Sequence, residues 1–258
     1  MHYDTIRYSV RDDAAVITLN RPEVKNALST QMRAEITHAM GAASKDARVA
    51  VITGAQDAFC SGQDLGDGIN AGNADLERIL RDEYDPMLQA IHNSKIPTIA
   101  AVNGVAAGAG ASLALAADVV IAAESAVFIQ AFTRIGLMPD GGGTYALPRQ
   151  IGMARAMGAS LFGDAIPADK AALWGMIYES VEDDLFAAHW QARAQHLAKG
   201  PTQSYAAIKE ALHASVNNTF PEQLALEAKL QGRCGTTRDF REGVVAFLEK
   251  RPAQFEGR

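Results

Sequence analysis

The chain has 258 residues, a formal net charge of −6 and a pI near 5.5. Hydrophobic residues make up 48% of it and charged residues 21%, which is typical of a soluble globular protein with a sizeable core and excludes a disordered chain. The acidic balance argues against general binding to nucleic acid or to anionic membranes.

In chain order, alternating apolar residues predict strands over 5–10 and 15–19. Ser29 is a candidate N-cap for a helix that runs to about residue 44. The short apolar run over 49–54 is typical of a buried parallel strand, and a polar loop is expected over 55–73.

Further along, the sequence predicts a helix over 75–93, a strand over 98–102, a helix over 108–117 and a strand over 118–122. Strands that alternate with helices indicate parallel βαβ units, so the fold class is α/β. After Pro148 the remaining segments are predicted helices: 153–162, 167–174, 185–199, 201–215, 221–232 and 237–250. We therefore expect an α/β core over residues 1–195 and a helical C-terminal region over 196–258.

The cellular setting is inferred from cysteine usage and from the apolar segments. Cys60 and Cys234 have no paired spacing, which fits a reducing, cytoplasmic compartment and provides neither a disulfide framework nor a zinc site. The N-terminus lacks a basic region followed by an apolar run, so no secretory signal is expected. Polar residues such as Asn103 and Asp118 interrupt the apolar stretch over 98–123, which favours a buried core over a membrane span.

Asp140 is the strongest candidate for chemistry. It is one of three carboxylates between residues 101 and 150, the others being Asp118 and Glu124, and it stands between apolar residues and a glycine run. A carboxyl group in such a setting can have a raised pKa and act as a general base or acid. The alternative is an N-cap for a helix that starts near Gly142, and the local sequence by itself favours that alternative.

Two glycine turns are candidate ligand-binding segments. One is 59–65, after a predicted strand, and the other is Gly108–Gly110, at a predicted helix start. Glycine lets the backbone approach a ligand closely, and two free N–H groups would form an oxyanion hole for a thioester carbonyl. Two ordinary tight turns are the alternative.

Other catalytic motifs are poorly supported. The phosphate-loop pattern, a GxGxxG after a strand and HExxH are absent, and the six histidines are scattered. The segment 110–114 departs by one residue from a nucleophile elbow, so Ser112 is interpreted as a packed helix serine. Cys60 has no nearby His or Lys to lower its pKa and is interpreted as a core residue.

Several motifs, taken in order, resemble the crotonase (enoyl-CoA hydratase/isomerase) superfamily over essentially the whole chain. They lie at 19–23 with 26–28, 59–65, 99–104 with 108–110, 136–144 and 175–177. Within the superfamily, residues 104–111, 137–140 and the tail over 241–255 are most similar to the phenylacetate-pathway isomerases, which act on ring-1,2-epoxyphenylacetyl-CoA.

The resemblance implies a spiral of ββα turns and a C-terminal helical region used in trimerisation, with a homotrimer or a dimer of trimers as the assembly. It also implies an acyl-CoA thioester as the bound substrate, and neither a metal nor a separate cofactor. The thioester carbonyl would lie between the backbone N–H groups of Ser61 and Ala109. The positions that match the CoA or acyl path are Lys25, Ala27, Gln63, Asp64, Leu65 and Phe132.

One departure from the family pattern bears on the reaction. Hydratases carry two glutamates that activate water, and the matching positions here are Ser112 and Phe132. Hydration is therefore disfavoured, while Asp140 matches the acid/base aspartate of several isomerase branches. The resemblance implies an isomerase that forms oxepin-CoA from the ring epoxide through a thioester enolate, and that also shifts 3-enoyl-CoA to 2-enoyl-CoA. A Δ3,Δ2-enoyl-CoA isomerase of fatty-acid oxidation and a non-catalytic acyl-CoA-binding protein remain as alternatives.

Overall fold

A six-stranded sheet forms the centre of the computed structural model, which describes residues 2–66 and 75–258. Its strand order is β1-β2-β3-β5-β7-β10. The hairpin β1–β2 is antiparallel, and β3, β5, β7 and β10 continue the sheet in parallel. The strand bounds are β1 Ile6–Arg11, β2 Ala14–Leu19, β3 Val49–Gly54, β5 Thr98–Val102, β7 Val119–Ala123 and β10 Glu179–Val181.

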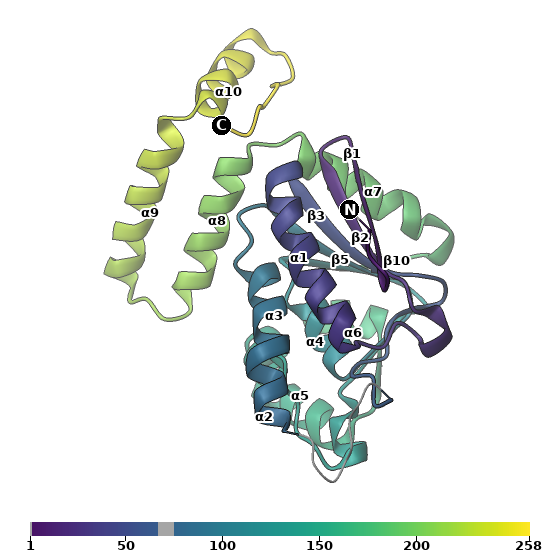
Figure 1. The fold of residues 1–258 in the computed structure, drawn as a ribbon. Coiled ribbons are helices and arrows are strands. Elements are labelled where there is room, and N and C mark those ends of the chain that lie inside the picture. The colour runs from purple at the N-terminus through teal and green to yellow at the C-terminus, as the bar shows by residue number, and fades with distance from the viewer. Residues whose placement is uncertain (1, 67–74) are drawn as a thin grey trace.

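Helices cover the sheet on both sides (Figure 1). Helix α1 (Thr30–Asp46) packs on β1, β2 and β3, and α7 (Asp183–Ala198) packs on β2, β3, β7 and β10. Burial on both faces explains why β3 and β5 are uninterrupted apolar runs in the sequence. The predicted N-cap of α1 is confirmed, because the Ser29 side chain accepts a hydrogen bond of 3.2 Å from Met32 N–H.

A second sheet of short strands was not predicted from the sequence. Its order is β4-β6-β8-β9, and each strand has three residues, too few to establish a period. Strands β4, β6 and β8 are parallel, and β9 is antiparallel to β8. The bounds are β4 Ala58–Cys60, β6 Val105–Ala107, β8 Val127–Ile129 and β9 Ala165–Pro167.

The predicted helix over 75–93 is present in three consecutive pieces. They are α2 (Leu76–Ile79), a π-helical segment (Leu80–Tyr84) and α3 (Asp85–His92). The last part of the predicted loop over 55–73, from residue 67 onward, lies outside the described residues.

Helix α5 (Gly143–Phe162) begins ten residues earlier than the predicted helix over 153–162. Gly152 interrupts it with φ 76° and ψ 160°, which explains why the sequence pattern predicts only the second half. The shorter helices nearby are η1 Pro22–Val24, α4 Ala109–Leu115, η3 Ala131–Ile135 and α6 Ala168–Trp174.

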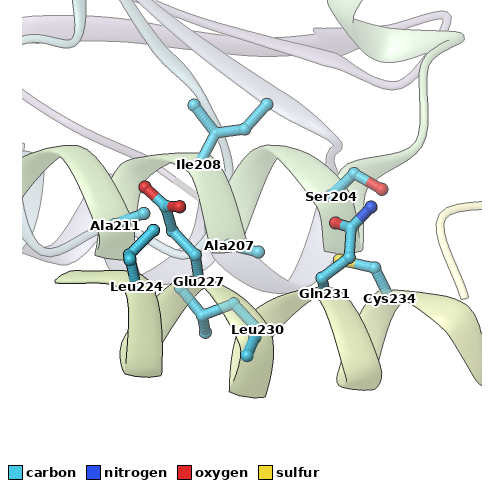
Figure 2. A pocket seen from close by; sticks show the side chains of 10 residues that line it. Ser204, Ala207, Ile208, Ala211, Leu224, Glu227, Leu230, Gln231 and Cys234 are labelled. Carbon is cyan, nitrogen blue, oxygen red and sulfur yellow. The ribbon is translucent and has the colours of Figure 1, made fainter. Parts of the chain in front are cut away.

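The C-terminal arm, residues 202–258, projects from the sheet core (Figure 1). It contains α8 (Thr202–Ser215), α9 (Phe220–Gly235) and α10 (Arg238–Glu249). An open cleft of about 530 Å³ lies between the facing side chains of α8 and α9. Figure 2 shows Ile208 and Leu224 among the side chains that line it. Within the described residues, no helix is both long and apolar enough to cross a membrane.

Candidate functional site

The two glycine turns meet at the N-terminus of α4. Gly62 has φ +100°, and a Cβ built on it would lie 2.8 Å from the Ala107 carbonyl oxygen and 3.4 Å from Ala109 N. A Cβ on Gly110 would lie only 2.3 Å from the Cys60 carbonyl oxygen. The absence of side chains therefore lets the loop after β4 lie directly on the start of α4, where helix N–H groups are free and the dipole is positive.

The expectation that Ser61 presents a free N–H group is wrong. Ser61 N–H donates a 3.0 Å hydrogen bond to the Lys25 carbonyl oxygen. Leu28 pairs with the same loop as an isolated parallel bridge, in which Leu28 N–H donates to Gly62 O at 2.8 Å and Asp64 N–H donates to Leu28 O at 3.2 Å. This pairing leaves the N–H of Gln63, the central residue of the bridge, directed away from Leu28.

The residues predicted to line the CoA path differ in the exposure and the bonding of their side chains. Lys25 and Leu65 have exposed side chains, while Ala27 is buried. Arg21 donates to the Ala27 carbonyl oxygen at 2.8 Å and forms a 2.7 Å ion pair with Asp64. Burial alone would raise the pKa of Asp64, but the hydrogen bonds from Arg21 and from a backbone N–H lower it. Asp64 therefore links its own loop to the loop of Arg21 through an ion pair, and it is not a candidate acid or base.

A buried polar cluster holds the Gln63 side chain, and the sequence did not reveal it. The Gln63 Oε1 atom accepts from the Tyr84 hydroxyl group and from Arg33 Nη1, the latter at 3.1 Å. Arg33 is 2% exposed and is paired with Glu83. Burial raises the pKa of Tyr84, so its hydroxyl group stays a donor at neutral pH. No motif marks Arg33 or Tyr84, because their importance depends on a contact between α1 and the π-helical segment.

Asp140 lies in the turn between η3 and α5, and its carboxylate caps no helix. Its backbone carbonyl oxygen accepts from Ser112 Oγ at 2.8 Å and from Gly143 N–H at 2.9 Å. Gly142 occupies the N-cap position of α5 in a left-handed conformation, without a side-chain cap. The N-cap interpretation of Asp140 is therefore wrong. We call residues 139–143 the Asp140 turn.

The Asp140 carboxylate has a buried oxygen atom without a hydrogen bond. Its Oδ1 atom is buried and has no hydrogen-bond partner among the described residues. Burial raises the pKa of Asp140 to about 6, so the group titrates close to neutral pH. Of the other two carboxylates considered, Asp118 is paired with Lys209 at 2.7 Å, and Glu124 is exposed. Asp140 alone of these three has the environment of a general base or acid.

Of the two positions matched to the hydratase glutamates, Ser112 contacts this turn and Phe132 lies beside the start of α4. Ser112 is 2% exposed on α4 and is bonded to the Asp140 carbonyl oxygen. Phe132, on η3, is 6% exposed, and its Cζ atom lies 3.9 Å from the point that a Cβ on Gly108 would occupy. An apolar ring therefore lies next to the start of α4. The described residues contain no cluster of three His, Cys, Asp or Glu side chains able to hold a metal ion.

Comparison with known proteins identifies the family of the chain. Residues 10–258 match the model of the enoyl-CoA hydratase/isomerase family. The chain belongs to this family. A probable enoyl-CoA hydratase of Rhodobacter capsulatus is 62% identical, with all of both chains aligned. The 1,2-epoxyphenylacetyl-CoA isomerase of Escherichia coli is 43% identical, over 96% of this chain and 97% of that protein.

The fold agrees with this membership. The crystal structure of a putative enoyl-CoA hydratase/isomerase from Mycobacterium abscessus superposes with a TM-score of 0.93 at 39% identity, over 98% of this chain and all of that one. The protein is thus a crotonase-fold enzyme of the acyl-CoA hydratase/isomerase group, as the sequence motifs predicted. The names of these two relatives include one hydratase and one isomerase.

Proposed function

We propose that the protein is an acyl-CoA isomerase that uses Asp140 as its single proton carrier. The observation that carries the proposal is the Asp140 carboxylate, whose buried Oδ1 atom has no hydrogen-bond partner among the described residues and whose pKa is raised to about 6. A base with that pKa is ionised at neutral pH and still returns its proton readily. The hydratase positions hold Ser112 and Phe132, neither of which is a carboxylate that could activate water.

The backbone of two loops supports an oxyanion hole in this proposal. The thioester carbonyl oxygen would accept from Ala109 N–H, at the start of α4, and from Gln63 N–H, which replaces Ser61 for the reason given above. Asp140 would remove a proton from the carbon next to the carbonyl group, the resulting enolate would be held by the two N–H groups, and the proton would return to another carbon. Loss of one such donor typically costs about 10²–10³ in rate.

The proposed acyl group is ring-1,2-epoxyphenylacetyl, with oxepin-CoA as product. The 43% identity to the E. coli isomerase and the Asp140 turn support this choice. Shift of a double bond from the 3,4 to the 2,3 position would use the same carboxylate and the same enolate. In the epoxide case, the ring C–C bond shared with the epoxide breaks as the seven-membered ring forms, and Asp140 moves one proton from the α carbon to a ring carbon. We further propose that no metal or separate cofactor takes part, because this isomerisation neither gains nor loses atoms or electrons.

The decisive experiment is the Asp140→Asn variant, assayed by product analysis with the epoxide thioester and with a 3-enoyl-CoA. Asparagine has the same shape and cannot accept the proton, so we expect turnover to fall by at least about 10³-fold in a folded protein. Near-normal turnover would contradict the proposal and would favour a non-catalytic acyl-CoA-binding role.

Hydration is the second candidate function, because the R. capsulatus relative is named a probable enoyl-CoA hydratase at 62% identity. We expect hydration of crotonyl-CoA to be negligible beside isomerisation, since Phe132 stands where a hydratase carries a glutamate that activates water. Comparable rates of the two reactions would mean that Asp140 activates water and that the enzyme is a hydratase.

We also propose that the C-terminal arm mediates self-association into a homotrimer or a dimer of trimers. Apolar side chains of α8, α9 and α10 are exposed, including Leu212 at 63% and Phe247 at 82%. A second open cavity, of about 900 Å³, lies between α8 and the core helices α3 and α5. Light scattering coupled to size exclusion would test this proposal, and a monomer at micromolar concentration would contradict it.

A further inference from the structure

Gln63 is held by its side chain as well as by its backbone. The isolated bridge with Leu28 fixes the backbone on both sides of Gln63, through the Gly62 carbonyl oxygen and the Asp64 N–H group. No residue that the structure describes accepts a hydrogen bond from the N–H group of Gln63 itself. The peptide group proposed to meet the thioester oxygen is therefore ordered by its neighbours and is still free to donate.

Two buried groups meet at the end of the Gln63 side chain. Its Oε1 atom accepts from the Tyr84 hydroxyl group and from Arg33 Nη1. The same Nη1 atom donates to the Leu28 carbonyl oxygen at 2.7 Å, so one guanidinium nitrogen links both partners of the bridge. Tyr84 is only 3% exposed, and the Arg33 guanidinium carbon lies 4.7 Å from the centre of its ring. Hydrogen bonds that are shielded from water in this way hold a side chain in one position.

The three groups come from elements that are far apart in the chain. Gln63 lies in the loop after β4, Arg33 lies on α1, and Tyr84 is the last residue of the π-helical segment Leu80–Tyr84. Turns of π-helix are rare and occur frequently at functional sites. Their meeting point is the side chain of the residue that follows Gly62, at the contact between the loop and the start of α4.

The Tyr84 hydroxyl group is already engaged as a donor and as an acceptor. It donates to Gln63 Oε1 and accepts from Arg33 Nη1 at 3.5 Å. Burial is the main cause that raises the pKa of Tyr84, and the charge of Asp140 raises it further, so Tyr84 keeps its proton while Asp140 is ionised. Tyr84 is therefore suited to holding Gln63 and unsuited to proton transfer.

We propose that Tyr84 is a positioning residue, which holds the Gln63 side chain so that the Gln63 N–H group stays directed at the thioester oxygen. The inference rests on the proposed function, since it takes Gln63 N–H as one of the two oxyanion donors. The hydrogen bond to an enolate reaches full strength only as charge develops in the transition state, so a displaced donor lowers kcat more than it weakens substrate binding. Complete loss of a donor costs about 10²–10³ in rate, and we expect displacement to cost about 10- to 100-fold.

The first test is Tyr84→Phe, which removes the hydroxyl group and keeps the ring. We expect kcat for the shift of a 3-enoyl-CoA to fall by about 10- to 100-fold, with KM changed by less than about threefold. Gln63→Met removes the acceptor, should show the same pattern, and serves as the second variant in case Tyr84→Phe does not fold. The double variant should be no slower than Gln63→Met alone, because Tyr84 acts through Gln63. Additive losses, or an unchanged kcat in Tyr84→Phe, would overturn the inference.

The second test does not depend on turnover. The infrared stretching frequency of the thioester carbonyl group, measured with phenylacetyl-CoA that carries ¹³C at that carbon, reports the hydrogen bonds to its oxygen. We expect this frequency to be lower in the native complex than in water, and to move back toward the value in water in Tyr84→Phe and in Gln63→Met. A native frequency in both variants would overturn the inference, as would a native complex with the frequency found in water.

The matched control is Tyr178→Phe, at a tyrosine that is 63% exposed. It should keep the native kcat and the native carbonyl frequency. Phenylacetyl-CoA is a substrate for neither isomerisation, so the infrared result is independent of the proposed activity. An active Asp140→Asn variant would refute the activity, and the carbonyl frequency would still report on Tyr84.

Discussion

Asp118 and Asp140 both lie beside the short helix α4, and their carboxylates have opposite surroundings. Asp118 follows the helix and accepts hydrogen bonds from Thr98 N–H at 2.8 Å and Thr98 Oγ1 at 2.9 Å, besides its 2.7 Å ion pair with Lys209. Asp140 meets α4 through its backbone, and its Oδ1 atom bonds to no described residue. A shielded carboxylate with partners stabilises the fold, while one without partners remains available for chemistry.

The largest effect expected from this contrast is on stability at Asp118. Asp118→Ala would leave Lys209 and Thr98 without their shared acceptor and loosen α8 from the core. We expect the free energy of unfolding to fall by about 3 kcal/mol, as when one partner of a buried ion pair is removed. Urea denaturation would measure it, and Glu124→Ala, at an exposed carboxylate, should change it by less than about 0.5 kcal/mol.

The pH dependence of turnover should come from Asp140. Its pKa is raised to about 6, and the base must be ionised, so activity should be full above that pH and fall about tenfold for each unit below it. At about pH 4 this amounts to a loss of about 100-fold, which steady-state kinetics of the 3-enoyl-CoA shift would detect. A flat profile down to that pH would remove Asp140 from the role of base.

The smallest effect expected is a gain of stability on neutralising Asp140. Its pKa rises from 3.8 to about 6 on burial, so between these values the folded state holds the proton more tightly and the free energy of unfolding falls as pH rises. Asparagine does not titrate, so the free energy of unfolding of Asp140→Asn does not fall over this pH range for that reason. We expect the variant to be more stable at neutral pH by about 1 kcal/mol, allowing for partial solvent screening. Thermal melts should show the difference vanishing below about pH 4, and a less stable variant would contradict this view.

The sequence predicted α1 and every strand of the central sheet except β10, because continuous apolar runs and the Ser29 cap are local signals. It did not predict β10 or the strands of the second sheet, β4, β6, β8 and β9, whose three-residue length leaves no period to recognise. The start of α5 was missed because Gly152 divides the helix. Local patterns therefore specify the long elements, and tertiary pairing determines the short ones.

For the candidate site, the roles of Asp140 and Ala109 stay predictions, whereas the N–H group that the family resemblance assigned to Ser61 is already bonded. Ser61 N–H is occupied by a carbonyl oxygen 36 residues earlier in the chain, that of Lys25. A contact between residues so far apart in the chain cannot be predicted from the local sequence.

The contact between Gly110 and the Cys60 carbonyl oxygen has a consequence for redesign. With a Cβ only 2.3 Å from that oxygen, any side chain at position 110 would force α4 away from β4 and carry the Ala109 N–H group with it. Position 110 is thus restricted to glycine by steric necessity. Selection for new acyl groups, natural or in the laboratory, would have to act at other positions, such as Phe132, whose ring lies beside the start of α4.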